Sequence, residues 1–273
     1  MTEAIAADKE ADEVKQDTEN TIFSGLRGFF VELTLLTRFT LRFFKEVFLP
    51  PYEFKELLKQ CYIVGYKSIP LVGITGFIMG LVLTIQSRPT LMDFGAESWL
   101  PGMVAISLIR EIGPVITALI CAGKTGSSIG AELASMKVTE QIDAMEVSGI
   151  NPFKYIVVTR VLATTLMIPI LVIFSDAIAI LGSFAGVNIK GDVNFHLFIA
   201  QVLSSLHFTD ILPAFIKTFF FGFAIGLIGC FKGYNSNKGT EGVGISANSA
   251  VVIGSLLIFI IDMIAVQLTS LFS

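Results

Sequence analysis

Five apolar stretches of this chain are each long enough to cross a lipid bilayer. They extend approximately over Tyr62–Gln86, Trp99–Ala122, Tyr155–Ile189, Ile211–Phe231 and Ser246–Phe272. A transmembrane helix needs about 20 mostly apolar residues. In addition, only 15% of the residues are charged, against about 25% in a soluble globular protein. The sequence therefore predicts an all-α integral membrane protein with five transmembrane helices.

Charged side chains interrupt these stretches. Arg110 and Glu111 stand side by side near the centre of the second stretch, Lys217 lies inside the fourth and Asp262 inside the fifth. A charge at the centre of a bilayer costs about 2.5–3.5 kcal/mol on the insertion scale, so such residues pair with one another or face a polar interior. Two interpretations follow: ion pairs that fix the packing of the helices, or polar groups along the path of a transported substrate.

The sequence before the first apolar stretch divides into two parts. Residues 1–20 contain seven acidic residues and two lysines, which predicts a disordered acidic tail. Residues 21–60 predict an amphipathic helix and a connector, and the transmembrane domain then occupies residues 61–273. We expect this helix to lie in the membrane interface; the alternative is a soluble helix packed on a partner. Its basic residues, which share one helix face, are Arg27, Arg38, Arg42 and Lys45.

Basic residues also predict how the chain is oriented in the membrane. Lysines and arginines concentrate before the first stretch, between the second and third, and after the fourth, whereas the other two loops contain only Arg88 and Lys190. Cytoplasmic loops carry the excess of basic residues. We therefore expect a cytoplasmic N-terminus and a C-terminus on the opposite side. A short apolar segment at residues 195–208 predicts a re-entrant or interfacial helix.

The segment between the second and third stretches predicts a short helix on the cytoplasmic surface of the membrane. It combines an apolar stripe with i, i+4, i+7 spacing and three acidic residues on other faces, which offer an anionic surface to a basic partner. We interpret it as a docking helix for a cytoplasmic motor subunit, with a solvated connecting helix as the alternative. The stripe is Val138, Ile142 and Met145, and the acidic residues are Glu140, Asp143 and Glu146.

Nucleotide, metal and catalytic sites are not expected in this chain. Gly123-Lys124-Thr125 resembles the end of a phosphate-binding loop, but Ala118 stands where that motif requires a glycine. The three cysteines, Cys61, Cys121 and Cys230, are too widely spaced to indicate a metal site. No nucleophile and base at a suitable spacing indicate an enzyme. An energy source for transport would then have to come from another subunit.

Three sequence runs are distinctive. Two of them are GFIMGLVLTIQ (76–86) and GVGISANSAVV (242–252). The longest is SLIREIGPVITALICAGKTGSSIGAELASMKVTEQIDAMEVSGINPF (107–153). These runs resemble the MlaE/YrbE family, the permease subunits of ABC-type lipid transporters that work with MCE-domain proteins. The resemblance extends from about Phe23 to the C-terminus and leaves the acidic tail outside.

The resemblance implies an assembly in the inner membrane of a Gram-negative bacterium. It implies a homodimer with an outward-open lipid cavity, and a cytoplasmic ATPase, carrying ATP and Mg²⁺, docked on residues 124–152. It also implies a STAS-domain protein bound to the ATPase, a hexameric MCE ring on the periplasmic face, and no nucleic acid. The residues matched to the lipid cavity are Leu83, Gln86, Leu91, Phe94 and Ile112; the matched membrane charges are Arg110, Glu111, Lys217 and Asp262.

Three functions remain open from the sequence. The first is transport of phospholipids between inner and outer membranes, which would maintain the lipid asymmetry of the outer membrane. The second is transport of another hydrophobic cargo, such as a sterol or a long-chain acid. The third is passive anchoring of a periplasmic MCE protein. An anionic headgroup and apolar tails fit a path with apolar walls and a few charged anchors, and the first function is therefore our expectation.

Overall fold

The computed structural model describes residues 27–28, 30–189, 191, 193–236 and 239–272. The chain divides into two compact units, Met1–Leu49 and Pro50–Ser273. In the first unit, residues 27–28 and 30–47 are helical and the four basic residues named above are exposed. The helix expected here is therefore present, while its place in the membrane interface stays a prediction. The expected disordered tail, residues 1–20, lies outside the described residues.

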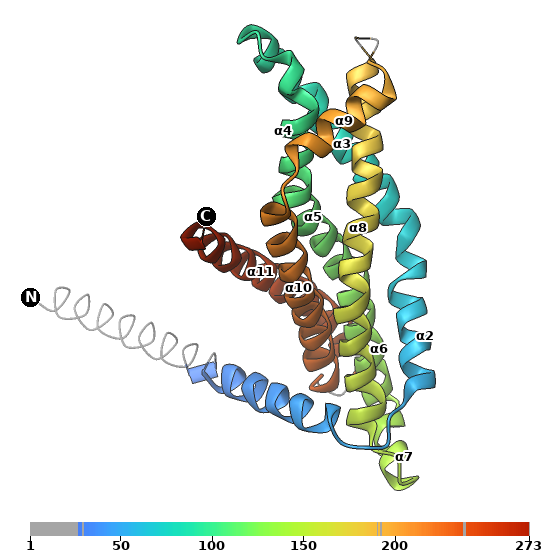
Figure 1. The fold of residues 1–273 in the computed structure, drawn as a ribbon. Helices are drawn as coiled ribbons and strands as arrows, with labels where there is room; N and C mark the ends of the chain where they lie inside the picture. The colour runs from blue at the N-terminus through green and yellow to red at the C-terminus, as the bar shows by residue number, and fades with distance from the viewer. Residues whose placement is uncertain (1–26, 29, 190, 192, 237–238, 273) are drawn as a thin grey trace, which may run out of the picture. The chain divides into compact units, whose positions relative to one another are not determined.

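The second unit confirms the all-α membrane fold (Figure 1). Its described residues form helices without strands, and five helical runs are long and apolar enough to cross a membrane. These runs are Phe54–Asp93, Glu97–Val138, Phe153–Asn188, Phe208–Tyr234 and Thr240–Leu271. Each covers all, or all but the last residue, of one of the five stretches expected from the sequence.

The first run begins earlier than the sequence predicted. It contains α2 (Phe54–Val64), the short 3-10 helix η1 (Tyr66–Ser68) and α3 (Ile69–Asp93). The two units meet between Leu49 and Pro50. Most of the segment expected as a connector up to residue 60 is therefore part of α2 and of the second unit. Its Glu56 is buried and accepts hydrogen bonds from Gln60 Nε2 at 2.8 Å and from the Tyr155 hydroxyl at 3.2 Å.

The second run continues well beyond the expected span. It contains the 3-10 helix η2 (Glu97–Trp99), α4 (Leu100–Ser107), the π-helical turn η3 (Leu108–Ile112), α5 (Gly113–Cys121), a second π-helical turn η4 (Ala122–Gly126) and α6 (Ser127–Val138). Gly123-Lys124-Thr125 therefore lies within a helix, not in a phosphate-binding loop. Lys124 Nζ contacts the Lys67 carbonyl and Ser68 Oγ of η1.

The short helix after α6 differs in part from the prediction. Helix α7 spans Gln141–Val147 and is preceded by Glu140 in a left-handed backbone conformation (φ 57°). Because this residue turns the chain, Val138 ends α6 and does not share a helix face with Ile142 and Met145, so the predicted i, i+4, i+7 stripe does not exist as one face. Ile142 is buried, whereas Glu140, Asp143 and Glu146 are exposed.

The last three runs complete the bundle. The third contains the π-helical turn η5 (Phe153–Val158) and α8 (Thr159–Asn188); the others are α10 (Phe208–Tyr234) and α11 (Thr240–Phe272). Helix α8 is the most buried of the spans and α11 the least. In Figure 1, α8 lies between α2 and α3 on one side and α10 on the other, and it packs against all three.

Glycines permit the closest helix contacts in the bundle. A Cβ atom at Gly80 of α3 would collide with the Ala179 carbonyl of α8, and one at Gly222 of α10 would lie 2.6 Å from the Thr164 carbonyl oxygen. Small residues let two helix backbones approach in this way, which favours packing inside a membrane.

The apolar segment between the third and fourth runs forms α9 (Phe195–Ser205), which crosses the end of the bundle near α3 and α4 (Figure 1). The Asn194 side chain caps its first turn by accepting a hydrogen bond from the His196 backbone N–H at 2.9 Å. Phe198 is fully buried and packs edge-on against Phe184 of α8. Whether α9 is re-entrant or interfacial stays a prediction.

Candidate functional site

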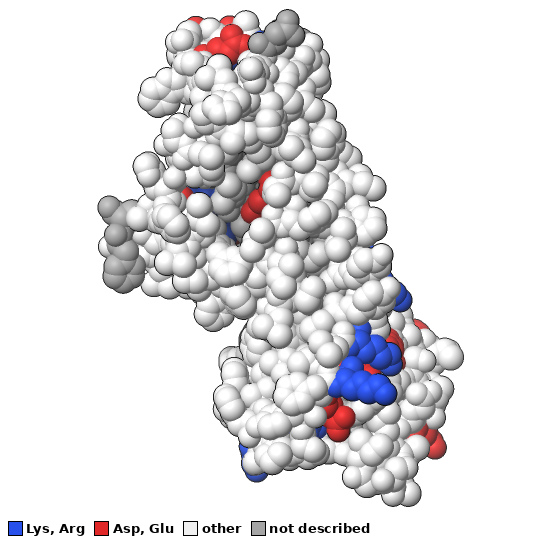
Figure 2. Space-filling view, turned by 45° about the vertical axis from the view of Figure 1, so that its right-hand side comes forward, with Lys and Arg blue, Asp and Glu red and all other residues white. Residues whose placement is uncertain are grey.

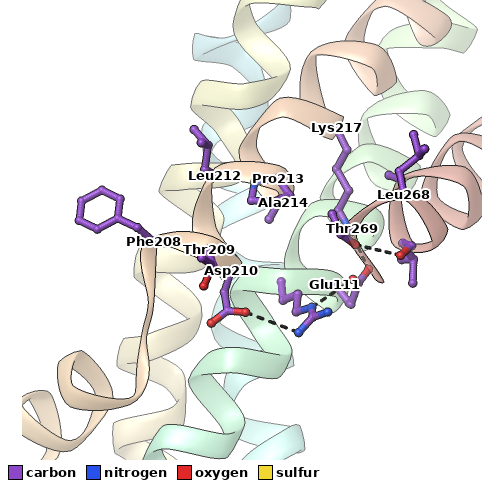
Figure 3. A pocket seen from close by; sticks show the side chains of 13 residues that line it. Glu111, Phe208, Thr209, Asp210, Leu212, Pro213, Ala214, Lys217, Leu268 and Thr269 are labelled. Atoms are coloured by element: carbon purple, nitrogen blue, oxygen red, sulfur yellow. Dashed lines mark hydrogen bonds and ion pairs between the residues drawn. The ribbon is translucent and has the colours of Figure 1, made fainter. Parts of the chain in front are cut away.

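Charged residues from three helices meet within the bundle. Lys217 of α10 donates from Nζ to Glu111 Oε2 of η3 at 2.6 Å (Figure 3). The same Nζ atom also donates to Asp262 Oδ1 of α11 at 2.8 Å. Only 4% of the Lys217 side chain is exposed. The structure thus brings together three of the four membrane charges named from the sequence, and each of these three is paired.

The fourth predicted charge, Arg110, joins this cluster through longer contacts. Its Nη1 atom lies 3.5 Å from Asp210 Oδ1, and its Nε atom lies 3.9 Å from Glu111 Oε1. The Arg110 side chain is 43% exposed. Arg110 is therefore held less tightly than Lys217 and remains accessible.

Asp210 was missed by the sequence analysis. It lies in the first turn of α10, just before the apolar stretch expected to begin at about Ile211, so hydropathy gave no signal for it. A signal was present nonetheless. Asp210 precedes Lys217 by seven residues, or two helical turns, and residues at that spacing share a helix face. We call the five residues Arg110, Glu111, Asp210, Lys217 and Asp262 the ionic network.

A π-helical turn places two adjacent residues in the network. The Gly113 backbone N–H bonds to the Leu108 carbonyl, five residues earlier, as in a π-helix. Pro114 follows and has no N–H group with which to continue a regular helical ladder. Arg110 and Glu111 both lie in the widened turn, and such turns often occur at functional sites.

The ionic network borders a cavity of about 700 Å³, a size that falls within the range of small-molecule sites. Arg110, Glu111, Asp210 and Lys217 supply its charged wall, and Thr209 and Thr269 add hydroxyl groups. In Figure 3, Glu111, Asp210 and Lys217 converge between the helices. The apolar lining consists of Phe208, Leu212, Pro213, Ala214, Ala265, Val266 and Leu268.

Charged atoms are rare on the face of the bundle seen in Figure 2. This face is largely uncharged between its two ends, at both of which charged side chains are visible, and it has a hollow in which acidic and basic atoms can be seen. A site with apolar walls and one charged side suits an amphiphile whose charged head contacts the ionic network and whose tails contact α10 and α11.

The five residues matched to a lipid cavity do not line this cavity. Leu83, Leu91 and Ile112 pack against the core cluster that contains Leu100, Leu108 and Phe198. Gln86 is exposed, and 82% of Phe94 is exposed. None of the five lines the 700 Å³ cavity. Their role in a cavity between two protomers stays a prediction.

A further acidic residue, Asp176, has one buried carboxyl oxygen without a hydrogen-bond partner. Asp176 of α8 has a buried Oδ1 atom that makes no hydrogen bond, and this atom lies where a Cβ of Gly113 would be. The absence of a side chain at Gly113 therefore accommodates this carboxyl group directly after the π-helical turn.

The acidic residues of α7 lie at the other end of the bundle from α9 (Figure 1). Asp143 pairs with Lys137 of α6 at 3.4 Å, while Val147 is 91% exposed and Ile150 is also exposed. An exposed surface that combines carboxylates and aliphatic side chains suits a protein partner. Among the described residues, no group of three or more His, Cys, Asp and Glu side chains is arranged to bind a metal ion.

Comparison with known proteins gives the family. The profile of the family described as "Permease MlaE" matches residues 57–268. A probable ABC transporter permease protein of Rickettsia typhi is 38% identical over 219 residues, which cover 80% of this chain and 85% of that protein.

Two further relatives extend the comparison. The intermembrane phospholipid transport system permease protein MlaE of Haemophilus influenzae is 38% identical over 214 residues, 78% of this chain and 82% of that protein. A probable ABC transporter permease of Synechocystis is 36% identical over 206 residues, 76% of this chain and 78% of that protein. The resemblance seen in the three sequence runs is therefore confirmed, and the chain belongs to the MlaE permease family.

Proposed function

We propose that this chain is the membrane subunit of an ABC transporter that moves phospholipids between the inner and outer membranes of a Gram-negative bacterium. The observation that carries the proposal is the cavity itself, which joins an apolar wall from α10 and α11 to a partly exposed arginine. The printed function of the Haemophilus influenzae relative, intermembrane phospholipid transport, supports the same cargo. Maintenance of outer-membrane lipid asymmetry would follow from such transport.

Arg110 is the residue we assign to the lipid phosphate. Lys217 already donates to two carboxylates at short distances and is almost fully buried. Arg110 makes only long contacts, and its planar guanidinium group can form two parallel hydrogen bonds to phosphate oxygens. The lipid tails would lie along the apolar side chains of α10 and α11. These side chains give the tails an apolar environment similar to the bilayer, so leaving the bilayer costs the tails little free energy.

The remaining subunits are part of the same proposal. The chain itself would hold no cofactor: ATP and Mg²⁺ would bind a separate ATPase docked on α7. We propose a homodimer, in which Leu83, Gln86, Leu91, Phe94 and Ile112 line a shared lipid cavity. A STAS-domain protein would bind the ATPase, and a hexameric MCE protein would cover the periplasmic face. The N-terminus would be cytoplasmic and the C-terminus periplasmic.

The cargo is tested with the purified complex. We expect mass spectrometry to find phospholipid bound to it, and ATP to drive transfer of a fluorescent phospholipid between vesicles. Arg110→Met should lower bound phospholipid and transfer severalfold, because the phosphate loses its cation. Lys55→Met, which removes an exposed cation from α2, serves as the matched control. A complex that holds a sterol or a long-chain acid and no phospholipid would favour the second cargo class.

Coupling to the ATPase is tested by reversing charge on α7. We expect the combined substitutions Glu140→Lys, Asp143→Lys and Glu146→Lys to abolish co-purification of the ATPase and ATP-driven transfer. Asp93→Lys, at an exposed position that ends α3, controls for charge reversal as such. If the triple variant retained the ATPase and normal transfer, docking on α7 would be excluded. A different result, a wild-type complex that shows no ATP-driven transfer, would favour the alternative function of a passive anchor for the MCE protein.

A further inference from the structure

We propose that the Arg110–Asp210 pair selects phospholipids whose headgroup carries an ammonium group over phospholipids whose headgroup has a net negative charge. This inference rests on the proposed phospholipid function and deepens it, because it names the class of headgroup. Asp210 is the specificity-determining residue, and Arg110 is the phosphate contact.

The charge balance of the ionic network is the first argument. Its members are two cations, Arg110 and Lys217, and three carboxylates, Glu111, Asp210 and Asp262, so their formal charges sum to −1. Every charged side chain that lines the cavity, among the described residues, is a member of this network. The network therefore has no surplus positive charge with which to balance a headgroup that carries a net negative charge.

The division of the network into a tight and a loose part is the second argument. The tight part consists of Lys217 with Glu111 and Asp262, at 2.6 and 2.8 Å. The loose part is the 3.5 Å contact between Arg110 and Asp210, whose side chains are 43% and 20% exposed. Because a hydrogen bond at that distance is weak, a phosphate group can replace Asp210 as the partner of Arg110 at little cost.

The consequence of that replacement is the third argument. Once Arg110 binds phosphate, the Asp210 carboxylate loses its cation while it still lines the cavity beside the headgroup. An ammonium group two carbons from the phosphate restores the balance, because it gives Asp210 a new partner. A glycerol headgroup leaves Asp210 unpaired next to the phosphate, and like charges at short range in a partly buried site repel each other.

The test measures which lipid the complex takes from a defined mixture. The purified complex is exchanged into micelles that contain equal amounts of phosphatidylethanolamine and phosphatidylglycerol, and bound lipids are quantified by mass spectrometry. We expect the wild-type complex to hold more phosphatidylethanolamine. Asp210→Asn should raise the ratio of bound phosphatidylglycerol to phosphatidylethanolamine by about three- to tenfold, as expected for loss of one partly buried charge contact.

Two further variants separate charge from structure. Asp210→Glu keeps the carboxylate and should keep the wild-type preference. Glu241→Gln removes a negative charge at an exposed position in the first turn of α11, at the opposite end of that helix from Asp262, and should leave the ratio unchanged. If Glu241→Gln changed the ratio as much as Asp210→Asn, the effect would come from net charge and the role of Asp210 would be refuted.

The outcomes also separate this inference from the proposed function. Bound phospholipid without a headgroup preference, or an unchanged ratio in Asp210→Asn, would overturn the inference and leave phospholipid transport intact. A wild-type complex that binds neither phospholipid would instead overturn the proposed function, and with it the basis of the inference.

Discussion

Replacing Lys217 with methionine tests what the ionic network does. Methionine has a similar length and no charge, so it removes the cation that now donates to Glu111 Oε2 and Asp262 Oδ1. In the variant, two carboxylates remain close together around an apolar side chain, with Arg110 as the neighbouring cation. We expect the variant to insert into the membrane but to lose both thermal stability and transport.

The size of the stability loss follows from burial. Removing one partner of a buried ion pair costs about 3–5 kcal/mol. The carboxylates left behind are partly exposed, Glu111 by 37% and Asp262 by 20%. Water can therefore solvate them, and we expect a smaller loss of about 2–3 kcal/mol. At about 2–4 °C per kcal/mol for a chain of this size, the unfolding midpoint should fall by about 4–12 °C.

The assay compares this variant with one in which the whole tight part is neutral: Lys217→Met, Glu111→Gln and Asp262→Asn. Each protein is heated in lipid nanodiscs, its folded fraction is measured by size-exclusion chromatography, and phospholipid transfer is measured in parallel. Replacing a complete ion cluster with neutral groups is often close to neutral for stability, so the triple variant should recover most of its midpoint while transfer stays low.

Two results would refute this reasoning. If the triple variant recovered transfer together with stability, the network would serve only to pack the helices, which is the alternative interpretation that the sequence left open. If Lys217→Met were as stable as the wild-type protein, the energetic argument from burial and pairing would be wrong.

Three other substitutions have expected outcomes in the same thermal assay. Gly80→Leu should lower the unfolding midpoint strongly, because the new side chain would collide with the Ala179 carbonyl where α3 and α8 touch. A midpoint within about 1–2 °C of the wild-type value would contradict this contact. Asp176→Asn should leave stability unchanged or raise it by up to about 1 kcal/mol, because the carboxyl oxygen has no hydrogen-bond partner to lose, and a clear loss would contradict that assignment. Glu132→Gln should cost about 1 kcal/mol, because the buried Arg160 loses its 2.8 Å ion pair but Glu132 is half exposed; no loss would show the pair to be dispensable.

The features that the sequence predicted correctly follow from the free-energy cost of placing polar and charged groups in a lipid bilayer, which applies to every membrane protein. A span must be long and apolar, so the five runs could be found from hydropathy alone. A charge inside a span must find a partner, so pairing of Lys217 and Asp262 could be expected before any geometry was known. Which carboxylates Lys217 would contact could not be predicted, because that depends on how three helices are arranged in space.

The continuation of the second run into α6 escaped prediction because hydropathy is a poor guide where small residues provide the packing. Helix α6 contains serines, glycine and charged residues, so it resembled a loop. Its buried residues nevertheless follow a helical period: Ile129 and Leu133 are four residues apart, as are Gly130 and Ala134. Gly130 also lies close to the backbone of α11 near Ser246. Helical periodicity of small residues was therefore the missed signal.

The π-helical turn explains how neighbouring residues acquire different roles. Consecutive residues of a regular α-helix point about 100° apart, and a π-helical turn is wider, so their directions lie closer together. Both Arg110 and Glu111 consequently contact α10, at Asp210 and Lys217, which lie about 10 Å apart along that helix. Glu111 belongs to the tight part that holds three helices together, whereas Arg110 remains accessible to a ligand. One local irregularity, favoured by the proline that follows Gly113, thus separates a structural contact from an exchangeable one.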